Sequence, residues 1–327
     1  MTGVRLANRY ELLERLGEGA FGVVHRAHDR TLDRDVAVKL ITARTLDAEA
    51  RERMLREARA AAALNHPHIV AVYDSGEDQG RPYMVMELIA GKNLRETSSL
   101  TLAELRDVAL QICDALAHAH RHGIVHRDLK PENVLMAEGP TVKLADLGIA
   151  YSNRATQLTS DGTILGTAAY LAPEQAMGLD VDGRTDLYAL GAILYERVAG
   201  RTPFEGDDPL AVISQHLHAP VVPPRTFRPD LPPALEAIIL KLLAKAPADR
   251  FASADDAAAA LASAALTPAA EAGEAPATTD RVVVLDQLAR GRLIGRRTEL
   301  QQLRELWARA RRGQGHLALV SGEPGVG

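Results

Sequence analysis

The octapeptide His126-Arg-Asp-Leu-Lys-Pro-Glu-Asn133 is the most informative stretch of this 327-residue sequence. It brings a carboxylate, an ammonium group and a carboxamide close together in the chain, shortly after a predicted helix. That helix begins at the capping box Thr101-Leu-Ala-Glu104, carries apolar residues at spacings of three and four, and ends at Gly123. The octapeptide therefore marks a candidate site, and the sequence on either side decides which kind of site it is.

Composition excludes several classes of protein. Hydrophobic residues make up 46% of the chain and charged residues 25%, which is ordinary for a globular protein. The net charge of −5 offers no general attraction for nucleic acid or an anionic membrane. The single cysteine, Cys113, excludes an intrachain disulfide framework, and no apolar run approaches the ~18 residues of a membrane span. Because no secretion signal opens the chain either, we expect a cytoplasmic protein.

The apolar pattern predicts a β-rich region followed by a larger helical region, which is an α+β fold. Strands are expected at Tyr10–Leu16, Val23–Ala27, Val36–Ile41, Ile69–Tyr73 and Pro82–Glu87. Further helices are expected at 47–64 and near 185–199, 208–217, 232–244 and 253–265. Aromatic residues make up only 4% of the chain, so Ala, Leu and Val must fill most of the core.

A glycine-rich segment lies between the first two predicted strands. Gly17-Glu-Gly-Ala-Phe-Gly22-Val-Val24 has the pattern GxGxxGxV, in which glycine lets backbone amides approach a phosphate closely. Alone the pattern is weak, and a glycine-rich hairpin without a ligand explains it equally well. Its position between strands argues against a Rossmann dinucleotide site, where the glycines open a helix.

A lysine follows on the next predicted strand, in Val36-Ala-Val-Lys39. By itself this is the pattern of a surface lysine whose charged end reaches solvent. Paired with the glycine-rich segment, Lys39 would meet the α- and β-phosphates of a nucleotide. Such a lysine needs a carboxylate to hold it, and Glu57 and Glu52 on the predicted helix are the candidates. A solvated helix face is the simpler interpretation of both glutamates.

Taken together, these motifs resemble the eukaryotic-type (Hanks-type) protein kinases, and particularly the bacterial serine/threonine kinases. They occur in the order of that family over residues 10–265. The resemblance implies a two-lobed protein kinase fold with a small β-rich lobe and a larger helical lobe. It also implies a serine/threonine protein kinase that transfers the γ-phosphoryl group of ATP, bound with Mg²⁺ or alternatively Mn²⁺, to hydroxyl groups of protein substrates.

The resemblance assigns roles to the polar residues of the octapeptide and to one later aspartate. Asp128 would accept the proton of the substrate hydroxyl. Lys130 would neutralise charge on the γ-phosphoryl group, and a lysine at this position is typical of kinases that act on serine and threonine. Asn133 and Asp146 would supply oxygen ligands for Mg²⁺.

The segment Asp146-Leu-Gly148 stands where the family has Asp-Phe-Gly. We interpret Leu147 as a tolerated repacking in an aromatic-poor core. A nucleotide-binding pseudokinase that regulates an attached domain is the alternative function. A pseudokinase normally lacks Lys39, Asp128 or Asp146, and all three are present here.

The resemblance also assigns a nucleotide pocket. Its residues would be Leu16, Gly17, Gly19, Gly22, Val24, Ala37, Lys39, Met86, Glu87, Leu88, Ile89 and Leu135. Met86 resembles the gatekeeper, and the backbone of 87–89 resembles the hinge that binds adenine. Each apolar member taken singly is also an ordinary core residue. The distance to the segment Leu64–Val70 favours Glu57 as the partner of Lys39.

The segment 149–172 resembles an activation loop. Thr159, Ser160 and Thr163 are the candidate phosphorylation sites, and Thr167 is expected in the peptide-binding site. Arg127 can pair with a phosphorylated loop, so we expect autophosphorylation, with a kinase dimer as a possible arrangement.

Three further residues match scaffold positions of the family. Glu174 and Arg250 match a long-range ion pair, and Asp186 matches a carboxylate that bonds the backbone of the catalytic loop. His118 and His122 share a helix face, but no cysteine or carboxylate completes a metal site around them, so we expect none. Cys113 is expected to be a buried small hydrophobic residue.

The last part of the sequence differs in character. Residues 266–280 are rich in Ala, Pro, Glu and Thr and predict a linker, with a long surface loop as the alternative. Residues 281–327 are expected to be the truncated start of a P-loop ATPase domain. Leu317–Gly327 resembles a strand entering a phosphate loop, and Ile294–Leu300 resembles the entry motif of AAA/STAND-type ATPases. A glycine-rich end without function is the alternative.

Overall fold

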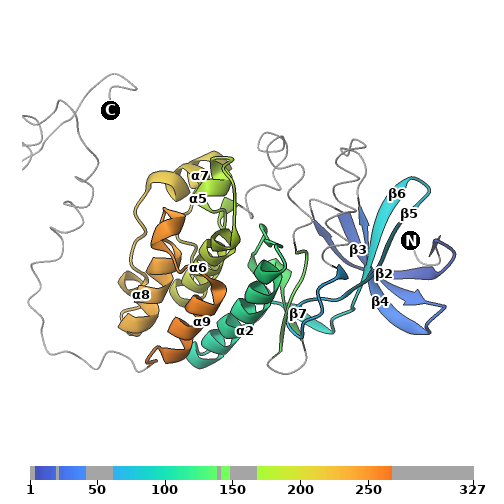
Figure 1. Ribbon diagram of the computed structural model, residues 1–327, viewed down its shortest axis with the longest axis horizontal. Coiled ribbons are helices and arrows are strands. Elements are labelled where there is room, and N and C mark those ends of the chain that lie inside the picture. Colours follow the sequence, from blue (N-terminus) through green and yellow to red (C-terminus); the bar gives the residue numbers. More distant parts are fainter. Residues whose placement is uncertain (1–3, 20–21, 42–61, 138–140, 148–167, 267–327) are drawn as a thin grey trace, which may run out of the picture. The chain divides into compact units, whose positions relative to one another are not determined.

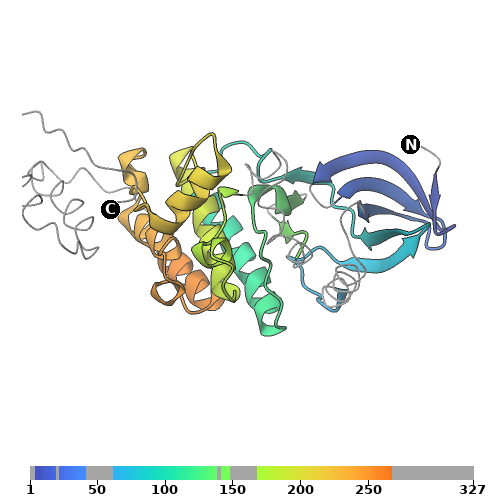
Figure 2. The same cartoon turned by 90° about the horizontal axis from the view of Figure 1, so that it is seen from above.

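The computed structural model describes residues 4–19, 22–41, 62–137, 141–147 and 168–266. The chain divides into two units, residues 1–270 and 271–327, and every described residue belongs to the first. Nearly all of the predicted linker, the predicted P-loop segment and most of the helix expected at 47–64 lie outside the described residues. The described elements are drawn in two views (Figures 1 and 2).

The N-terminal part of the first unit is a six-stranded antiparallel sheet with the strand order β1-β2-β3-β4-β6-β5. Its strands are β1 (Arg5–Leu6), β2 (Tyr10–Gly19), β3 (Gly22–Asp29), β4 (Arg34–Ile41), β5 (Val72–Asp78) and β6 (Arg81–Met86). The strands expected at Tyr10–Leu16, Val23–Ala27, Val36–Ile41 and Pro82–Glu87 are confirmed as β2, β3, β4 and β6.

The strand expected at Ile69–Tyr73 is wrong in its position, because the observed strand β5 begins at Val72. Ile69 instead forms an isolated parallel bridge with Leu144. The N–H of Leu144 donates to the carbonyl of His68, and its own carbonyl accepts from the N–H of Val70. The backbone of residues 68–70 thus pairs with a strand of the second sheet rather than with the first sheet. The apolar pattern alone does not distinguish these two partners.

The two faces of the six-stranded sheet bury different clusters, because successive side chains of a strand point to opposite faces. On one face Val36 and Val38 of β4 pack with Leu12 of β2 and Val85 of β6. On the other face Ala37 packs in a cluster with Met84 and Met86 of β6, Leu135 and Ala145. The second cluster joins the sheet to the chain that follows it.

A small second sheet follows, with the strand order β7-β8-β9. Its strands are β7 (Gly91–Asn93), β8 (Val134–Ala137) and β9 (Val142–Leu144). The short 3₁₀ helix η2 (Pro131–Asn133) leads directly into β8. The octapeptide therefore ends where this small sheet begins.

Helix α2 (Leu102–Arg121) begins and ends as the sequence predicts. The Thr101 hydroxyl accepts from the N–H of Glu104 at 3.2 Å, and Glu104 Oε2 accepts from the N–H of Thr101 at 2.8 Å. This reciprocal pair is the predicted capping box. Gly123 follows with a φ of +72°, a left-handed conformation that favours glycine after a helix end. Cys113 is fully buried inside α2, as expected, and burial raises the pKa of its thiol to about 12.

The remaining helices surround α6 (Gly183–Ala199), most of whose residues are buried. They are α5 (Pro173–Ala176), α7 (Pro209–His218), α8 (Pro233–Leu242) and α9 (Ala254–Ser263), with short 3₁₀ turns η4 (Pro224–Thr226) and η5 (Pro247–Asp249). Helices α2, α8 and α9 all pack on α6 (Figure 1). The close approach of α8 requires Gly191, since a Cβ there would lie 2.7 Å from the Cβ of Leu242. Within the described residues, no helix is long and apolar enough to cross a membrane.

A buried ion pair fixes α5 to this helical core. Arg250 Nη1 and Nη2 lie 2.7 and 2.8 Å from the two carboxylate oxygens of Glu174, and both side chains are almost fully buried. The other Arg250 donors bond the carbonyls of Arg184, Ala244 and Lys245. All five guanidinium N–H groups therefore have acceptors, which is what a buried arginine requires. The predicted long-range ion pair is confirmed.

Candidate active site

The octapeptide forms a loop between α2 and β8, and its backbone is held from α6. Asp186, in the first turn of α6, accepts from the N–H of His126 and from the N–H of Arg127, each at 2.8 Å. Nε2 of His120 lies 2.7 Å from the same carboxylate. Asp186 itself is 1% exposed. The predicted bond between Asp186 and the loop backbone is confirmed.

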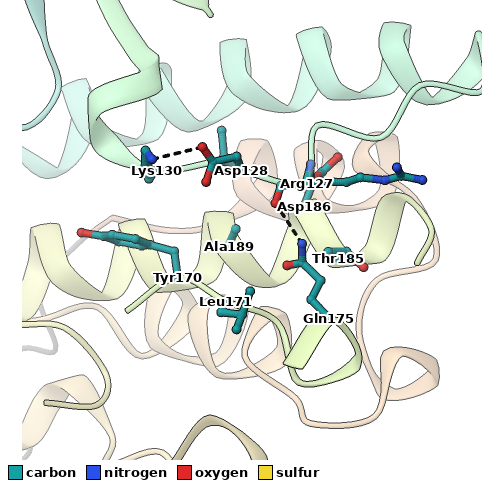
Figure 3. A pocket seen from close by; sticks show the side chains of 10 residues that line it. Arg127, Asp128, Lys130, Tyr170, Leu171, Gln175, Thr185, Asp186 and Ala189 are labelled. Carbon is teal, nitrogen blue, oxygen red and sulfur yellow. Dashed lines mark hydrogen bonds and ion pairs between the residues drawn. The ribbon is translucent and has the colours of Figure 1, made fainter. Parts of the chain in front are cut away.

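The side chains of Asp128, Lys130 and Asn133 converge within this loop. Asp128 is 7% exposed, and the Nζ of Lys130 lies 3.0 Å from its Oδ2 (Figure 3). Asn133 donates its Nδ2 to the main-chain oxygen of Asp128 at 2.7 Å. That bond fixes the orientation of the carboxamide and turns its oxygen, the atom suited to a hard cation, away from the donor side.

Lys39 meets Asp146 across the boundary between the two sheets. Lys39 lies on β4 and is 5% exposed, and its Nζ is 2.7 Å from Oδ2 of Asp146. Asp146 follows β9, and the N–H of the preceding Ala145 donates to the carbonyl of Asn133. This backbone bond brings the two predicted metal ligands, Asn133 and Asp146, into adjacent positions. Glu57 and its rival Glu52 lie outside the described residues.

The predicted nucleotide pocket is an apolar cluster between the sheets. Its predicted members pack together: Val24, Ala37, Met86, Leu88, Ile89 and Leu135. The side chain of Glu87 points elsewhere, because its Oε2 accepts from the Nζ of Lys143 at 2.8 Å. The N–H of Glu87 donates to the carbonyl of Ala71, so the hinge donors that remain for a ligand lie in residues 88–89.

The glycine-rich segment is the hairpin between β2 and β3. Gly17 lies opposite Val24 and Gly19 opposite Gly22, while the tip, residues 20–21, is outside the described residues. Gly22 has a φ of +150°, and a Cβ there would lie 2.0 Å from the carbonyl oxygen of Leu40, so no other residue fits. An added Cβ at Gly17 or Gly19 would meet nothing within 4 Å. Packing among the described residues therefore does not account for these two glycines. Leu16, which precedes them, is half exposed.

These groups fit a nucleotide bound with a divalent metal. The apolar cluster matches a base, the glycine hairpin leaves room for phosphates, and Asn133 and Asp146 offer hard oxygen ligands. Among the described residues, no group of three or more His, Cys, Asp or Glu side chains could hold a metal by itself. A Mg²⁺ site of one or two protein oxygens completed by phosphates and water needs no such group.

Comparison with known proteins decides the family. The model of the protein kinase domain matches residues 10–262. The chain belongs to the protein kinase family. Its kinase domain is 44% identical over 263 residues to a probable serine/threonine-protein kinase, SCO3848, of Streptomyces coelicolor, covering 77% of this chain and 39% of that protein. It is also 44% identical over 261 residues to the serine/threonine-protein kinase PknB of Mycolicibacterium smegmatis, covering 76% and 42%.

A solved structure agrees with this assignment. The crystal structure of the Mycobacterium tuberculosis PknI kinase domain superposes with a TM-score of 0.64 at 33% identity, covering 80% of this chain and 98% of that one. The predicted protein kinase fold is thereby confirmed. The chain spans about two fifths of the length of the curated relatives it matches.

The structure describes Leu147 but not the predicted phosphorylation and peptide-binding residues. Leu147 is 4% exposed and packs in the main hydrophobic core. The candidate phosphorylation sites Thr159, Ser160 and Thr163, and the expected peptide-binding Thr167, lie outside the described residues.

The histidines of α2 lie beside one another. The rings of His118 and His122 are 4.6 Å apart, and those of His118 and His66 are 4.8 Å apart. His122 Nδ1 lies 2.8 Å from the carbonyl oxygen of His118.

Sequence reasoning missed two sets of contacts around the catalytic loop of the kinase domain. Arg95 bonds Glu132 of the octapeptide at 2.9 Å, and it also contacts Tyr170 and Glu196. Gln175, next to the predicted ion-pair residue Glu174, donates to the main-chain oxygen of Arg127 at 2.9 Å. The only sequence signal for Gln175 is its place directly after Ala172-Pro-Glu174.

Proposed function

We propose that this chain transfers the γ-phosphoryl group of Mg·ATP to serine and threonine hydroxyl groups of proteins. The observation that carries the proposal is the buried carboxylate of Asp128, with the ammonium group of Lys130 3.0 Å away. Asp128 lies on a loop whose backbone Asp186 holds rigidly. A fixed carboxylate beside a fixed cation suits phosphoryl transfer, in which positioning and charge stabilisation supply most of the catalysis.

The side chains act in distinct places. Asp128 orients the substrate hydroxyl and accepts its proton, a contribution of about 10²–10⁴-fold to the rate. Lys130 keeps a positive charge beside that carboxylate, where negative charge develops on the transferred group. Lys39, held by Asp146, binds phosphate oxygens, and Asn133 and Asp146 hold the metal. When bound, ATP would supply the phosphoryl group, and the accompanying Mg²⁺ would neutralise part of the charge on its phosphates.

The substitution Asp128→Asn tests this function. We expect transfer of radiolabelled phosphate from ATP to the chain itself, or to casein as a hydroxyl-bearing probe, to fall by about 10² or more. Unchanged ATP binding, measured by fluorescence titration, controls for folding. If the unsubstituted chain binds ATP but transfers no phosphate, the alternative function, a pseudokinase module that regulates an attached domain, replaces this one.

Autophosphorylation within the segment 149–172 is part of the proposal. The relevant hydroxyls are those of Thr159, Ser160 and Thr163, and trans-phosphorylation would involve a kinase dimer. A phosphorylated loop pairs well with an arginine such as Arg127 because Arg–phosphate bonds are charge-assisted. Mass spectrometry of the active chain should find phosphate in this segment, and an unmodified segment in an active sample would contradict the proposal.

For the rest of the chain we propose a kinase domain over 10–265, a linker over 266–280, and the beginning of a P-loop ATPase domain of AAA/STAND type over 281–327. The support is the glycine spacing of Gly322 and Gly327 after an apolar stretch. A Lys-Ser or Lys-Thr pair encoded directly after Gly327 would support this, and any other pair would contradict it. The need for ATP and the single cysteine support a cytoplasmic location.

A further inference from the structure

The residue before the catalytic aspartate has an unusual backbone conformation. Arg127 has a φ of +65°, in the left-handed region that residues other than glycine rarely adopt. Such a conformation costs free energy and persists only where the surrounding structure imposes it. The hydrogen bonds of the Arg127 backbone show which contacts impose it.

Both backbone polar groups of Arg127 are bonded to side chains distant in the sequence. Its N–H donates to Oδ1 of Asp186 in α6, and its carbonyl accepts from Nε2 of Gln175 in α5 (Figure 3). That carbonyl belongs to the peptide that joins Arg127 to Asp128. The N–H of the same peptide faces Nδ1 of His126 at 3.3 Å. The peptide plane that aims Asp128 is therefore held at both its oxygen and its nitrogen.

Gln175 is itself fixed in orientation. Its Oε1 accepts from the N–H of Ala172 at 3.2 Å, which is the capping interaction of α5. Because the oxygen faces Ala172, the Nε2 donor faces Arg127. The neighbouring Glu174 is locked by Arg250 and by the hydroxyl of Thr185. The donor thus comes from a rigid support rather than from a freely rotating side chain.

We propose that Gln175 is a positioning residue for phosphoryl transfer. Its amide holds the Arg127–Asp128 peptide plane and thereby directs the Asp128 carboxylate toward the substrate hydroxyl. Because α5 directly follows residues 168–172, the same side chain couples the placement of those residues to the catalytic loop. This inference rests on the proposed kinase function.

Two substitutions separate the two bonds that Gln175 makes. Gln175→Glu keeps an oxygen for the N–H of Ala172 but removes the donor to Arg127 and places a negative charge against its carbonyl. Gln175→Lys keeps a donor of similar reach but removes the acceptor for Ala172. A role limited to capping α5 predicts loss only in the lysine variant, whereas the positioning role predicts loss mainly in the glutamate variant.

The measurement is the initial rate of phosphate transfer from radiolabelled ATP to casein by the whole chain, at several ATP concentrations and at pH 6 to 8. We expect Gln175→Glu to lower kcat about tenfold at pH 8 without changing KM for ATP. Placement against the Arg127 carbonyl raises the pKa of the new carboxyl group, and the deficit should shrink wherever that group becomes protonated, because it can then donate to Arg127 again. Gln175→Lys should keep kcat within about threefold of the unsubstituted chain.

Gln215→Glu is the matched control, because Nε2 of Gln215 donates to the main-chain oxygen of Glu205, on the edge of α7. The same chemical change there should leave kcat and its pH profile unaltered. Equal kcat and equal pH profiles for Gln175→Glu and the unsubstituted chain would overturn the inference. An inactive unsubstituted chain would instead overturn the proposed function. Should Gln175→Glu fail to fold, a lower kcat in Gln175→Met than in Gln175→Lys supports the inference, and equal values refute it.

Discussion

The candidate catalytic loop and the predicted nucleotide pocket lie on neighbouring elements but are held by different forces. The loop around Asp128 is fixed by hydrogen bonds to its backbone from Asp186, Gln175 and Asn133. The pocket formed around Ala37 is fixed by packing of apolar side chains from two sheets. Hydrogen bonds depend on the placement of single atoms, whereas apolar packing depends on the volume of the side chains. We therefore expect removal of one charge to destabilise the loop around Asp128. We expect a shortened side chain to destabilise the pocket around Ala37.

The largest effect is expected where a charge beneath the loop loses its partner. Arg250→Leu leaves the Glu174 carboxylate buried without its cation and should lower the free energy of unfolding by about 3–5 kcal/mol. Burial together with loss of the cation would then raise the pKa of Glu174, which Arg250 now helps to hold below its usual value. Urea denaturation measures the loss. The double variant Arg250→Leu, Glu174→Leu should recover part of it, and a double variant as unstable as the single one would show that charge burial is not the cause.

A somewhat smaller effect on the free energy of unfolding is expected in the apolar cluster around Ala37. Met84 is 1% exposed and packs beside Met86 behind the pocket, so Met84→Ala should lower the free energy of unfolding by about 2–4 kcal/mol. Because no directional bond is lost, kcat per folded molecule should stay within about twofold. Denaturation curves and kinase assays on the same preparation test both statements. A large fall in kcat would mean that the pocket positions reacting groups as the loop does.

Acid should lower the free energy of unfolding more gradually, through the buried His216 of α7. Burial, with a smaller contribution from the charge of Lys245, lowers the pKa of His216 to about 3. Below pH 6.5 the unfolded chain binds a proton there that the folded chain does not, so stability is complete above pH 6.5 and is lost as the pH falls toward 3. The loss reaches about 2 kcal/mol by pH 5. Urea midpoints from pH 7.5 to 5 should flatten in His216→Gln, whereas His218→Gln at an exposed neighbouring position should keep the slope of the unsubstituted chain.

The smallest effect on stability is expected at the start of α2, away from both the loop around Asp128 and the pocket. Thr101→Ala removes the hydroxyl that accepts from the N–H of Glu104 and should cost about 1 kcal/mol. Thr101→Ser keeps the acceptor and serves as the control. A thermal melt of the three proteins should place the serine variant close to the unsubstituted chain and the alanine variant below both. A loss as large as that of Arg250→Leu would show that local capping contributes as much as the buried charge pair.

Much of the fold was predictable because its signals are local. The nearly continuous apolar run Val36–Ile41 and the capping box at Thr101 act within a few residues, so they define strand β4 and helix α2 directly. The strand expected at Ile69–Tyr73 was misplaced because its backbone partner, Leu144, is distant in the chain. Hydropathy reports which side chains are buried but not which strand accepts a hydrogen bond.

In the candidate site too, some features follow from local sequence and others depend on the tertiary structure. The identities of Asp128, Lys130 and Asn133 follow from one octapeptide, whose side chains converge because they share one tight loop. The pairing of Lys39 with Asp146 depends on how the two sheets meet. The left-handed conformation of Arg127 depends on α5 and α6 together.

The sequence by itself placed this chain in the protein kinase family, predicted the side chains of the candidate site, and indicated the order of most of its elements. Only the tertiary structure decided that Asp186 accepts from the N–H of Arg127 while Gln175 donates to the carbonyl of the same residue. The physical reason is that a hydrogen bond between α5 and the catalytic loop requires a placement within a few tenths of an ångström. That placement results from the packing of α6 and the buried Glu174–Arg250 pair, which no local pattern encodes.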